Sequence, residues 1–317
     1  MARFLIRRLL AMVPVVVIVS MLAFSLILLL PGDPALMMLA DQNSANTEAY
    51  QALRTQLGLD KPLPLQYLSW ALRALRGDLG LSLRNNLPIG HEIAAHIFPT
   101  AELAALALLL AVLIAVPAGV ISALKPGSAA DLGATFVALG GVAVPPFFLA
   151  ILLIYVFAVW LRVLPLSGYV APWDDPGQNL RLMILPAITL ASGLSAVLMR
   201  QIRSALIEVM QQEYIVTARA KGLAETVVVV GHALKNALIP VLTILGLQVG
   251  TLIGGAVLTE TIFSIPGMGR MIVDSIFFRD FPTVQAAVLI LALSVLAANL
   301  ATDVVYAYVD PRIRHDR

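Results

Sequence analysis

Residues 9–30 read LLAMVPVVVIVSMLAFSLILLL and contain no charged side chain. A run of this length crosses a hydrocarbon core about 30 Å thick when it is helical. Further apolar runs of this kind lie at residues 103–124, 132–161, 182–199, 237–258 and 284–309. The sequence therefore predicts an all-α integral membrane protein with six transmembrane helices.

The composition also favours lipid as the surrounding solvent. Of the 317 residues, 60% are hydrophobic and 13% are charged, and the mean hydropathy is +0.91. These values are too apolar for a soluble domain of this length. The net charge of +2 gives no basic surface for nucleic acid, and the lack of cysteine excludes disulfides, thiolate metal sites and cysteine nucleophiles.

The first apolar run differs from a secretory signal, although Arg3, Arg7 and Arg8 precede it. A signal core has roughly 7–15 apolar residues and ends at a small-residue cleavage site. This run is longer and ends in Pro31-Gly32-Asp33-Pro34-Ala35. We therefore expect residues 1–30 to form a retained first helix.

The third run carries Pro145-Pro146, which lacks two backbone donors. Such a pair breaks or kinks a helix, and membrane proteins tolerate it where neighbours satisfy the free carbonyls. We interpret it as a packing kink within one span.

The distribution of Lys and Arg predicts the orientation of the chain. With the N terminus inside, the inner side holds twelve of these residues and the outer side nine, five of which lie in residues 31–100. Long translocated segments largely escape the positive-inside rule, and the short loops show a clear bias. Both termini are therefore predicted to be cytoplasmic.

Residues 31–97 form the predicted extracytoplasmic segment between the first two helices. They mix an amphipathic stretch at 65–75 with turn-forming residues, which are Gly58, Pro62, Pro64, Gly77, Gly80 and Pro88. This pattern predicts a small folded cap.

The longest cytoplasmic loop, residues 200–235, has the pattern of helices. Ile202, Leu206, Val209 and Met210 recur at helical spacing, so the fourth helix should continue past the membrane with one apolar stripe on its own subunit.

A second helical segment, residues 213–223, follows in this loop. The small side chains of Thr217, Ala218 and Ala220 allow a partner to approach closely, and Gly222 can end the helix in the left-handed conformation. A short helix is then expected to turn back through His232 and Asn236 toward Pro240.

Physics alone leaves two interpretations of this loop open. A rigid helix-turn-helix can transmit force from a partner to two spans. An amphipathic loop can instead lie on the lipid headgroups.

Residues 213–223, EYIVTARAKGL, together with residues 232–240, HALKNALIP, resemble the EAA-loop signature of peptide/nickel-type ABC permeases. The same family is resembled by Pro31-Gly32-Asp33-Pro34 and by residues 57–62, 77–82 and 310–314. The acidic and first alanine positions of the general EAA motif fall near Val216 and Thr217, so the founding glutamate is absent in register.

The resemblance implies a type I ABC importer fold and a permease that binds no cofactor, with ATP and Mg²⁺ held by partner subunits. It places the chain in the bacterial inner membrane beside a second homologous permease, two ATP-binding subunits and an extracytoplasmic solute-binding protein. A heterodimer of permeases is expected, and a homodimer remains open.

The implied domains are residues 1–30, 31–97, a core of 98–309 with its coupling loop at 200–240, and a tail of 310–317. The residues assigned to docking of the ATP-binding subunit are Glu213, Tyr214, Thr217, Ala218, Arg219, Ala220, Lys221, Gly222 and Leu223.

Residues 259–285 are too polar and too interrupted to span the membrane. Pro266, Gly267 and Gly269 predict a turn, and residues 271–277 predict an interfacial helix. The resemblance places this region at the outer gate near the binding protein, with Glu260, Pro266, Gly267, Gly269, Arg270, Arg279 and Asp280 as its residues. A purely structural re-entrant turn is the alternative.

Polar residues within the predicted spans are few. Gln248, Thr251 and Asn299 are candidates for lining a solute path. Membrane helices also use such groups as interhelical hydrogen bonds worth roughly 1 kcal/mol each, which we expect for most of them.

Three other classes of protein fit the sequence less well. An ATPase needs Gly-Lys followed by Ser or Thr, and none of Lys61, Lys125, Lys221 and Lys235 follows a glycine. A membrane enzyme or an ion-coupled transporter needs ionisable groups at membrane depth, whereas the four histidines, His91, His96, His232 and His315, lie in loops or at a terminus. A metal at His91, Glu92 and His96 is less expected than solvated loop histidines. The transported solute stays open among dipeptides, oligopeptides, glutathione, nickel chelates and some glycans or opine-like solutes.

Overall fold

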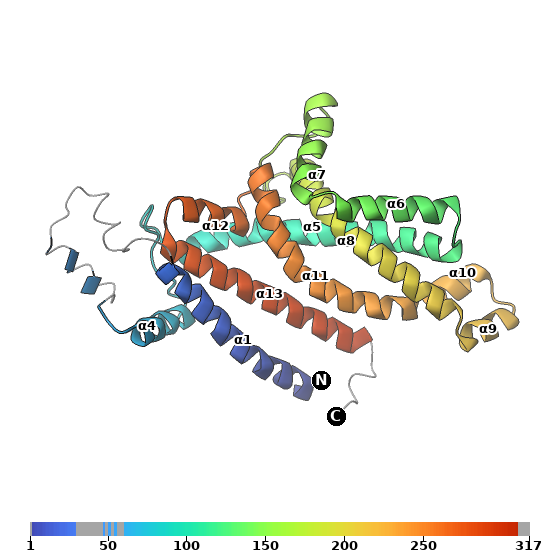
Figure 1. Ribbon diagram of the computed structural model, residues 1–317, viewed down its shortest axis with the longest axis horizontal. Helices are drawn as coiled ribbons and strands as arrows, with labels where there is room; N and C mark the ends of the chain where they lie inside the picture. The colour runs from blue at the N-terminus through green and yellow to red at the C-terminus, as the bar shows by residue number, and fades with distance from the viewer. Residues whose placement is uncertain (1, 30–46, 48–49, 52–53, 56–59, 310–317) are drawn as a thin grey trace. The chain divides into compact units, whose positions relative to one another are not determined.

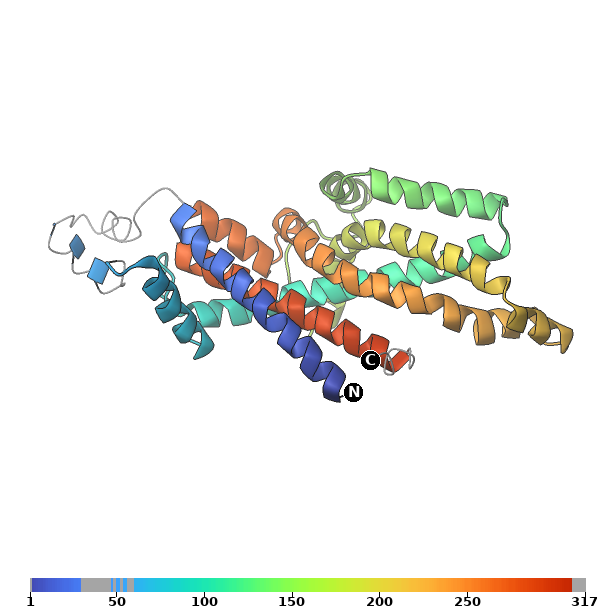
Figure 2. The same cartoon turned by 60° about the horizontal axis from the view of Figure 1, so that its bottom comes forward.

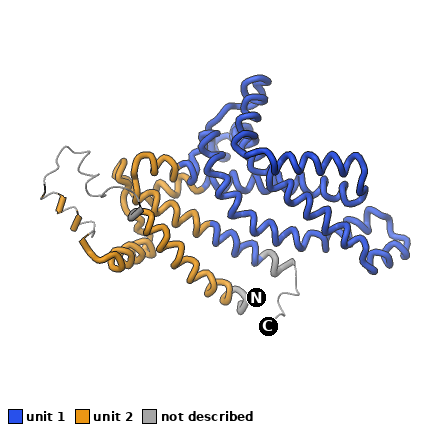
Figure 3. The backbone as a smooth tube through the Cα atoms, in the orientation of Figure 1, with its two compact units in different colours: residues 1–5, 98–270, 295–317 blue, residues 6–97, 271–294 orange. Residues whose placement is uncertain are grey.

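The computed structural model describes residues 2–29, 47, 50–51, 54–55 and 60–309. These residues divide between two compact units, of which unit 1 comprises residues 1–5, 98–270 and 295–317 and unit 2 comprises residues 6–97 and 271–294 (Figure 3). The described part is helical and has no strand beyond an isolated bridge between Leu81 and Pro88. The predicted all-α membrane fold is confirmed. The motifs at Pro31-Gly32-Asp33-Pro34, at 57–59 and at 310–314 lie outside the described residues.

Most of the predicted spans are single long helices (Figure 1). Among the described residues, five helices are long and apolar enough to cross a membrane, and a bent pair brings the number to six if it counts as one span. These five helices are α1 (Ala2–Leu29), α5 (Ile89–Leu124), α8 (Pro176–Met210), α11 (Leu234–Phe263) with its preceding turns, and α13 (Phe281–Val309).

The third predicted span is the one that differs. It consists of α6 (Ala129–Ala143), α7 (Pro146–Leu153) and a π-helix, η1 (Ile154–Trp160), and the two halves meet at 106°. Val144 and Pro145 both precede a proline and both are extended, with ψ of 121° and 137°. A residue before proline is driven out of the helical region, and two in succession break the helix completely. The interpretation as a simple packing kink is therefore wrong.

Unit 1 is built around α8, which packs against α6, α7 and α11. Figure 2 shows α6 running alongside α8. The side chains of α5 in the same buried cluster repeat every four residues as Leu103, Ala107, Ala111 and Ala115, each fully buried. Gly119 continues this ridge, where a methyl group would lie 2.8 Å from Ile202. The row of small residues lets the helix backbones approach closely, which is how membrane helices associate.

An ion pair joins α6 to α8 in the same unit. The Arg203 guanidinium donates from Nε and Nη2 to the two carboxylate oxygens of Asp131, over 2.8 and 2.9 Å. Asp131 is buried and also accepts from the backbone of Gly127 at 2.9 Å. Ser128 caps α6 by accepting from the Asp131 amide. This arrangement fixes the start of α6 against α8.

Unit 2 contains the amphipathic stretch predicted at 65–75. It forms α4 (Leu63–Leu75), whose buried Trp70 packs with Phe24 of α1 and Leu289 of α13. The Tyr67 ring meets Phe24 edge-on at 5.7 Å between centroids, and its hydroxyl is 2.8 Å from Ser20 Oγ. The helical part of the predicted cap is therefore held by aromatic packing.

Candidate functional site

The loop between α8 and α11 is a folded elbow, here defined as residues 211–227. The chain leaves α8 after Met210 and forms α9 (Glu213–Ala220), then α10 (Glu225–Val227). A π-helix, η2 (Val228–Ala233), follows without a break and leads into α11. The short second helix expected near His232 is thus the first part of one continuous helix from Glu225 to Phe263. In both views α9 lies at the end of α8 (Figure 1 and Figure 2).

One face of α9 is buried in its own chain. Ile215 and Ala218, three residues apart, belong to a cluster with Leu206 of α8 and Ala237 of α11. Val209 and Met210 pack against this cluster, which confirms the predicted apolar stripe at the end of α8. The elbow is therefore held as a rigid element, because moving α9 would expose these apolar groups.

The opposite face of α9 and the turn after it are open to solvent. The exposed residues that were assigned to docking are Glu213, Tyr214, Thr217, Arg219, Ala220, Lys221, Gly222 and Leu223. Ala218 is different, because it is 92% buried inside the chain and offers no surface to a partner. Val216 and Val227, which the sequence analysis did not assign, expose 59% and 48% of their area and extend the apolar part of this face.

The turn after α9 has the conformation that the sequence predicts. Gly222 has φ of +76°, and its amide donates to the Arg219 carbonyl at 2.9 Å. Across the turn, Arg219 Nη2 and Nε donate to the two Glu225 oxygens at 2.6 and 3.1 Å. The hydrogen bond from Glu225 raises the pKa of Arg219. Both side chains are exposed, so the pair orients the turn more than it stabilises the fold.

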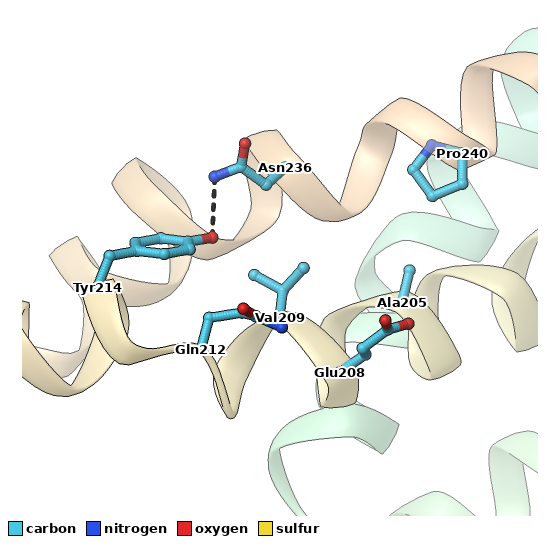
Figure 4. Close-up of a pocket in the computed structure, with 7 residues that line it drawn as sticks. All are labelled: Ala205, Glu208, Val209, Gln212, Tyr214, Asn236 and Pro240. Atoms are coloured by element: carbon cyan, nitrogen blue, oxygen red, sulfur yellow. Dashed lines mark hydrogen bonds between the residues drawn. The ribbon is translucent and has the colours of Figure 1, made fainter.

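A cavity of about 650 Å³ opens beside Tyr214, between the end of α8, α9 and the start of α11 (Figure 4). Asn236 Nδ2 donates to the Tyr214 hydroxyl at 2.9 Å and to the His232 carbonyl at 3.0 Å. The lining residues are Ala205, Glu208, Val209, Gln212, Tyr214, Asn236 and Pro240. Sequence reasoning missed this cavity because three separate segments line it, although Asn236 and Pro240 lie in the motif at 232–240.

The other end of α11 holds a buried carboxylate. Glu260 is fully buried, and it accepts from the Thr100 hydroxyl at 2.6 Å and from the Arg270 amide at 3.0 Å. The same Thr100 oxygen accepts from the Met268 amide at 2.8 Å. Met268 begins α12 (Met268–Phe277), whose first amides have no partners within the helix. Glu260 and Thr100 thus satisfy the amino end of α12.

The glycines after α11 leave room for this carboxylate. A methyl group on Gly267 would lie 2.2 Å from Glu260 Cδ, and one on Gly269 would lie 2.5 Å from Val257 Cα. The predicted turn is confirmed at residues 264–267, and it begins at Ser264 with φ of 55°. Gly269 was wrongly placed in the turn, since it lies in the first turn of α12. Pro266 is exposed.

A hydrogen bond from the Tyr169 hydroxyl joins the segment after η1 to α5. Tyr169 donates to Glu102 Oε2 at 2.7 Å, and Glu102 lies two residues after Thr100 on α5. Burial and this hydrogen bond raise the pKa of Tyr169 above its usual range. The hydroxyl therefore stays protonated at physiological pH and remains a donor.

Asp280 and Arg279 lie in unit 2 and form a separate arrangement. Asp280 is buried and accepts from the Ser82 hydroxyl at 2.5 Å, the Leu83 amide at 3.0 Å and the Thr283 hydroxyl at 2.8 Å. Arg279 is exposed with φ of 57°. Asp280 therefore ties the motif at 77–82 to the start of α13.

The candidate path residues lie on two helices. Gln248 and Thr251 share α11, where the Thr251 hydroxyl donates to the Gln248 carbonyl at 2.7 Å. Asn299 is exposed on α13.

At the alternative metal site, the His96 ring nitrogen lies 2.7 Å from the Glu92 carbonyl. Within the described residues, no group of three or more His, Asp or Glu side chains is placed to hold a metal ion.

Comparison with known proteins identifies the family. Residues 115–315 match the family described as "Binding-protein-dependent transport system inner membrane component", and residues 1–86 match its N-terminal family, "Binding-prot-dependent transport system membrane comp, N-term". The elbow and Glu260 lie within the first match, whereas Thr100 lies between the two matched ranges.

Full-length relatives agree with this result. The chain is 39% identical over 340 residues to the dipeptide transport system permease protein DppB of Escherichia coli K12, with all of both chains covered. It is 41% identical to DppB of Alkalihalophilus pseudofirmus and 40% identical to the glutathione transport system permease protein GsiC of Escherichia coli, each over 99% of this chain and all of the relative.

The fold is shared with a solved transporter. A chain of the inward-facing MetNI methionine ABC transporter superposes with a TM-score of 0.57 at 17% identity, covering 69% of this chain and 96% of that chain. The expected type I importer fold and the resemblance to this permease family are both confirmed. The chain belongs to the family of binding-protein-dependent transport system inner membrane components, and it is a multi-pass permease subunit of an ABC importer in the inner membrane.

Proposed function

We propose that this permease forms part of the translocation path for small peptides and receives its driving force through the exposed face of the elbow. The substrate class is inferred from the relatives, whose names give dipeptide and glutathione transport. Glutathione is itself a peptide, so a short peptide is the substrate common to both. The ATP is hydrolysed by partner subunits, and this chain contributes no catalytic residue.

The observation that carries the coupling role is the two-faced burial of α9. Ile215 and Ala218 fix the helix to α8 and α11, whereas Thr217, Ala220 and Lys221 face solvent. A partner that grips the exposed face therefore moves α8 and α11 together. A loop that only lay on headgroups would need no anchor within its own chain, but Ile215 and Ala218 are buried against α8 and α11, while Val216 remains exposed. This distribution favours the force-transmitting alternative.

The cavity beside Tyr214 supports the same role. It opens next to the exposed face of α9 and is lined by both apolar and polar groups, including Val209, Glu208 and Asn236 (Figure 4). A partner side chain entering it would contact α8, α9 and α11 at once. We propose that the ATP-binding subunit uses this cavity together with the exposed face of α9.

The orientation follows from the number of spans. With six crossings, the elbow after the fourth span lies on the same side as both termini. We propose that this side is the cytoplasm, where the ATP-binding subunits reside, and that residues 31–97 face the solute-binding protein. A second permease completes the path, because six helices alone enclose little space.

The test uses the two alanines on opposite faces of α9. Ala220→Leu adds bulk to the exposed face, whereas Ala218→Leu adds the same bulk to the buried face. In the purified complex we expect Ala220→Leu to accumulate normally yet to lose most co-purifying ATP-binding subunit and at least tenfold of dipeptide uptake into vesicles. Normal retention of the ATP-binding subunit and normal uptake by Ala220→Leu would contradict the proposed docking face.

A further inference from the structure

The buried Glu260 site takes no part in the docking described above. The burial of its polar groups nevertheless requires an explanation. Glu260 is 0% exposed, Thr100 is 6% exposed and Met268 is 1% exposed. Burying a carboxylate is costly unless hydrogen bonds satisfy it, and removal of one partner leaves the rest unsatisfied. A buried and satisfied carboxyl can fix the relative position of the elements that it joins.

Three elements meet at this carboxylate. Glu260 belongs to α11, Thr100 belongs to α5, and the amides of Met268 and Arg270 belong to the first turn of α12. The Thr100 hydroxyl links the other two, because it accepts from Met268 and donates to Glu260. The Glu260 carboxyl also lies at the amino end of α12, where the first amides need acceptors from outside the helix.

The turn between α11 and α12 is equally constrained. The Ile265 amide donates to the Glu260 carbonyl at 2.9 Å, so the backbone and the side chain of Glu260 bind both sides of the turn. Gly267 and Gly269 allow no side chain without displacing neighbouring atoms. The amino end of α12 therefore has to follow the end of α11 when α11 tilts.

The same helix reaches the elbow. Asn236, which binds Tyr214 of α9, and Glu260 are 24 residues apart on α11. At a rise of 1.5 Å per residue this corresponds to about 36 Å, enough to cross the hydrocarbon core. A displacement at the elbow thus arrives at the Glu260 site along one continuous helix.

We infer that Glu260 and Thr100 are positioning residues that make α12 move with α11, so that the ATP-driven movement of the elbow reaches the opposite side of the membrane. This inference rests on the proposed docking at the elbow. It assigns the coupling to a hydrogen-bonded junction, whereas the resemblance to the family placed Glu260 only in the region of the outer gate.

The test compares two substitutions of Thr100 in the assembled transporter in vesicles. Thr100→Val keeps the shape and removes the hydroxyl, whereas Thr100→Ser keeps the hydroxyl and serves as the control. ATP hydrolysis and peptide uptake are measured on the same preparation. We expect Thr100→Val to retain at least half of the ATP hydrolysis while the uptake per ATP falls at least tenfold, and Thr100→Ser to stay within twofold of the parent.

A second measurement follows α12 directly. The natural chain lacks cysteine, so Phe277→Cys provides a single thiol at a position that is 80% exposed at the end of α12. In the parent we expect the rate of maleimide labelling to change at least threefold when a non-hydrolysable ATP analogue is added. With Glu260→Gln, where an amide donor replaces one of the two accepting oxygens, we expect that change to disappear while the labelling itself persists.

The outcomes separate this inference from the proposed function. A parent complex that retains no ATP-binding subunit would contradict the proposed function. A normally coupled parent together with a Thr100→Val variant of equal uptake per ATP, or a nucleotide-dependent change that survives in Glu260→Gln, would overturn the inference about Glu260 alone.

Discussion

The two ends of α11 differ in how they use polar residues. At the elbow, Glu213, Lys221 and the pair Arg219–Glu225 are exposed, and a cavity opens beside Tyr214. At the other end, the carboxylate of Glu260 is fully buried and two glycines surround it. Exposed polar groups remain available to a partner, whereas a buried and satisfied carboxylate fixes elements of its own chain. This contrast underlies our proposal that one end of α11 receives a force and the other end passes it to α12.

The strongest test of this contrast is the Gly267→Ala substitution. Its methyl group would overlap the Glu260 carboxylate, so either the carboxylate loses its partners or the turn opens. We expect a loss of about 3 kcal/mol in the free energy of unfolding, at the upper end of the cost of overpacking. Thermal unfolding of the purified permease in detergent measures this loss, and a variant as stable as the parent would show that the site is not tightly packed.

Glycine at the elbow should behave differently. Gly222 has φ of +76°, but no atom lies within 4 Å of the position that a Cβ would take. Gly222→Ala therefore costs only the left-handed conformation, about 1–2 kcal/mol. Gly222→Asn should cost less, since asparagine adopts this conformation more readily. If Gly222→Ala and Gly222→Asn destabilise the permease equally in thermal unfolding, backbone strain at residue 222 does not cause the loss.

The two faces of α9 give the next prediction. Ala218→Leu inserts a side chain into the buried cluster and should destabilise the permease by about 1–3 kcal/mol. Ala220→Leu lies on the exposed face and should stay within about 0.5 kcal/mol. Chemical denaturation of the two variants in parallel checks the difference, and equal losses would refute the assignment of the faces.

The smallest effect is expected at Tyr214. Tyr214→Phe removes the hydroxyl that accepts from Asn236, a hydrogen bond between exposed residues, and should cost about 0.5 kcal/mol. Asn236 keeps its bond to the His232 carbonyl, so the start of α11 should remain ordered. Hydrogen exchange of the backbone amides of residues 228–236 tests whether this segment remains ordered. Extensive loss of protection in Tyr214→Phe would show that the contact stabilises the start of α11 by more than about 0.5 kcal/mol.

Sequence patterns predicted those features that depend on local periodicity. Long apolar runs predicted the membrane spans. The spacing of Ile202 and Leu206 predicted that α8 continues past the membrane, and Gly222 predicted where α9 ends. Each of these follows from neighbouring residues along one helix.

Features that depend on three-dimensional contact were not predicted. The 106° break at Pro145-Pro146 was taken for a kink, because the pattern does not say whether neighbours hold the two halves in line. Ala218 was assigned to a partner, since a small side chain is equally compatible with packing inside the chain. The bond between Thr100 and Glu260 joins residues 160 positions apart, and no local pattern reports such a pair.

The central claim is that an ATP-hydrolysing subunit contacts the exposed face of α9. Thr217→Cys in the natural cysteine-free chain introduces one thiol on this face, and Leu247→Cys introduces a control thiol that is 75% exposed within the α11 span. Each is modified with a photoactivatable maleimide in the assembled transporter and then illuminated. The account predicts a covalent adduct with the ATP-binding subunit from Thr217→Cys and none from Leu247→Cys. An actively transporting complex in which Thr217→Cys forms no adduct with that subunit would contradict it.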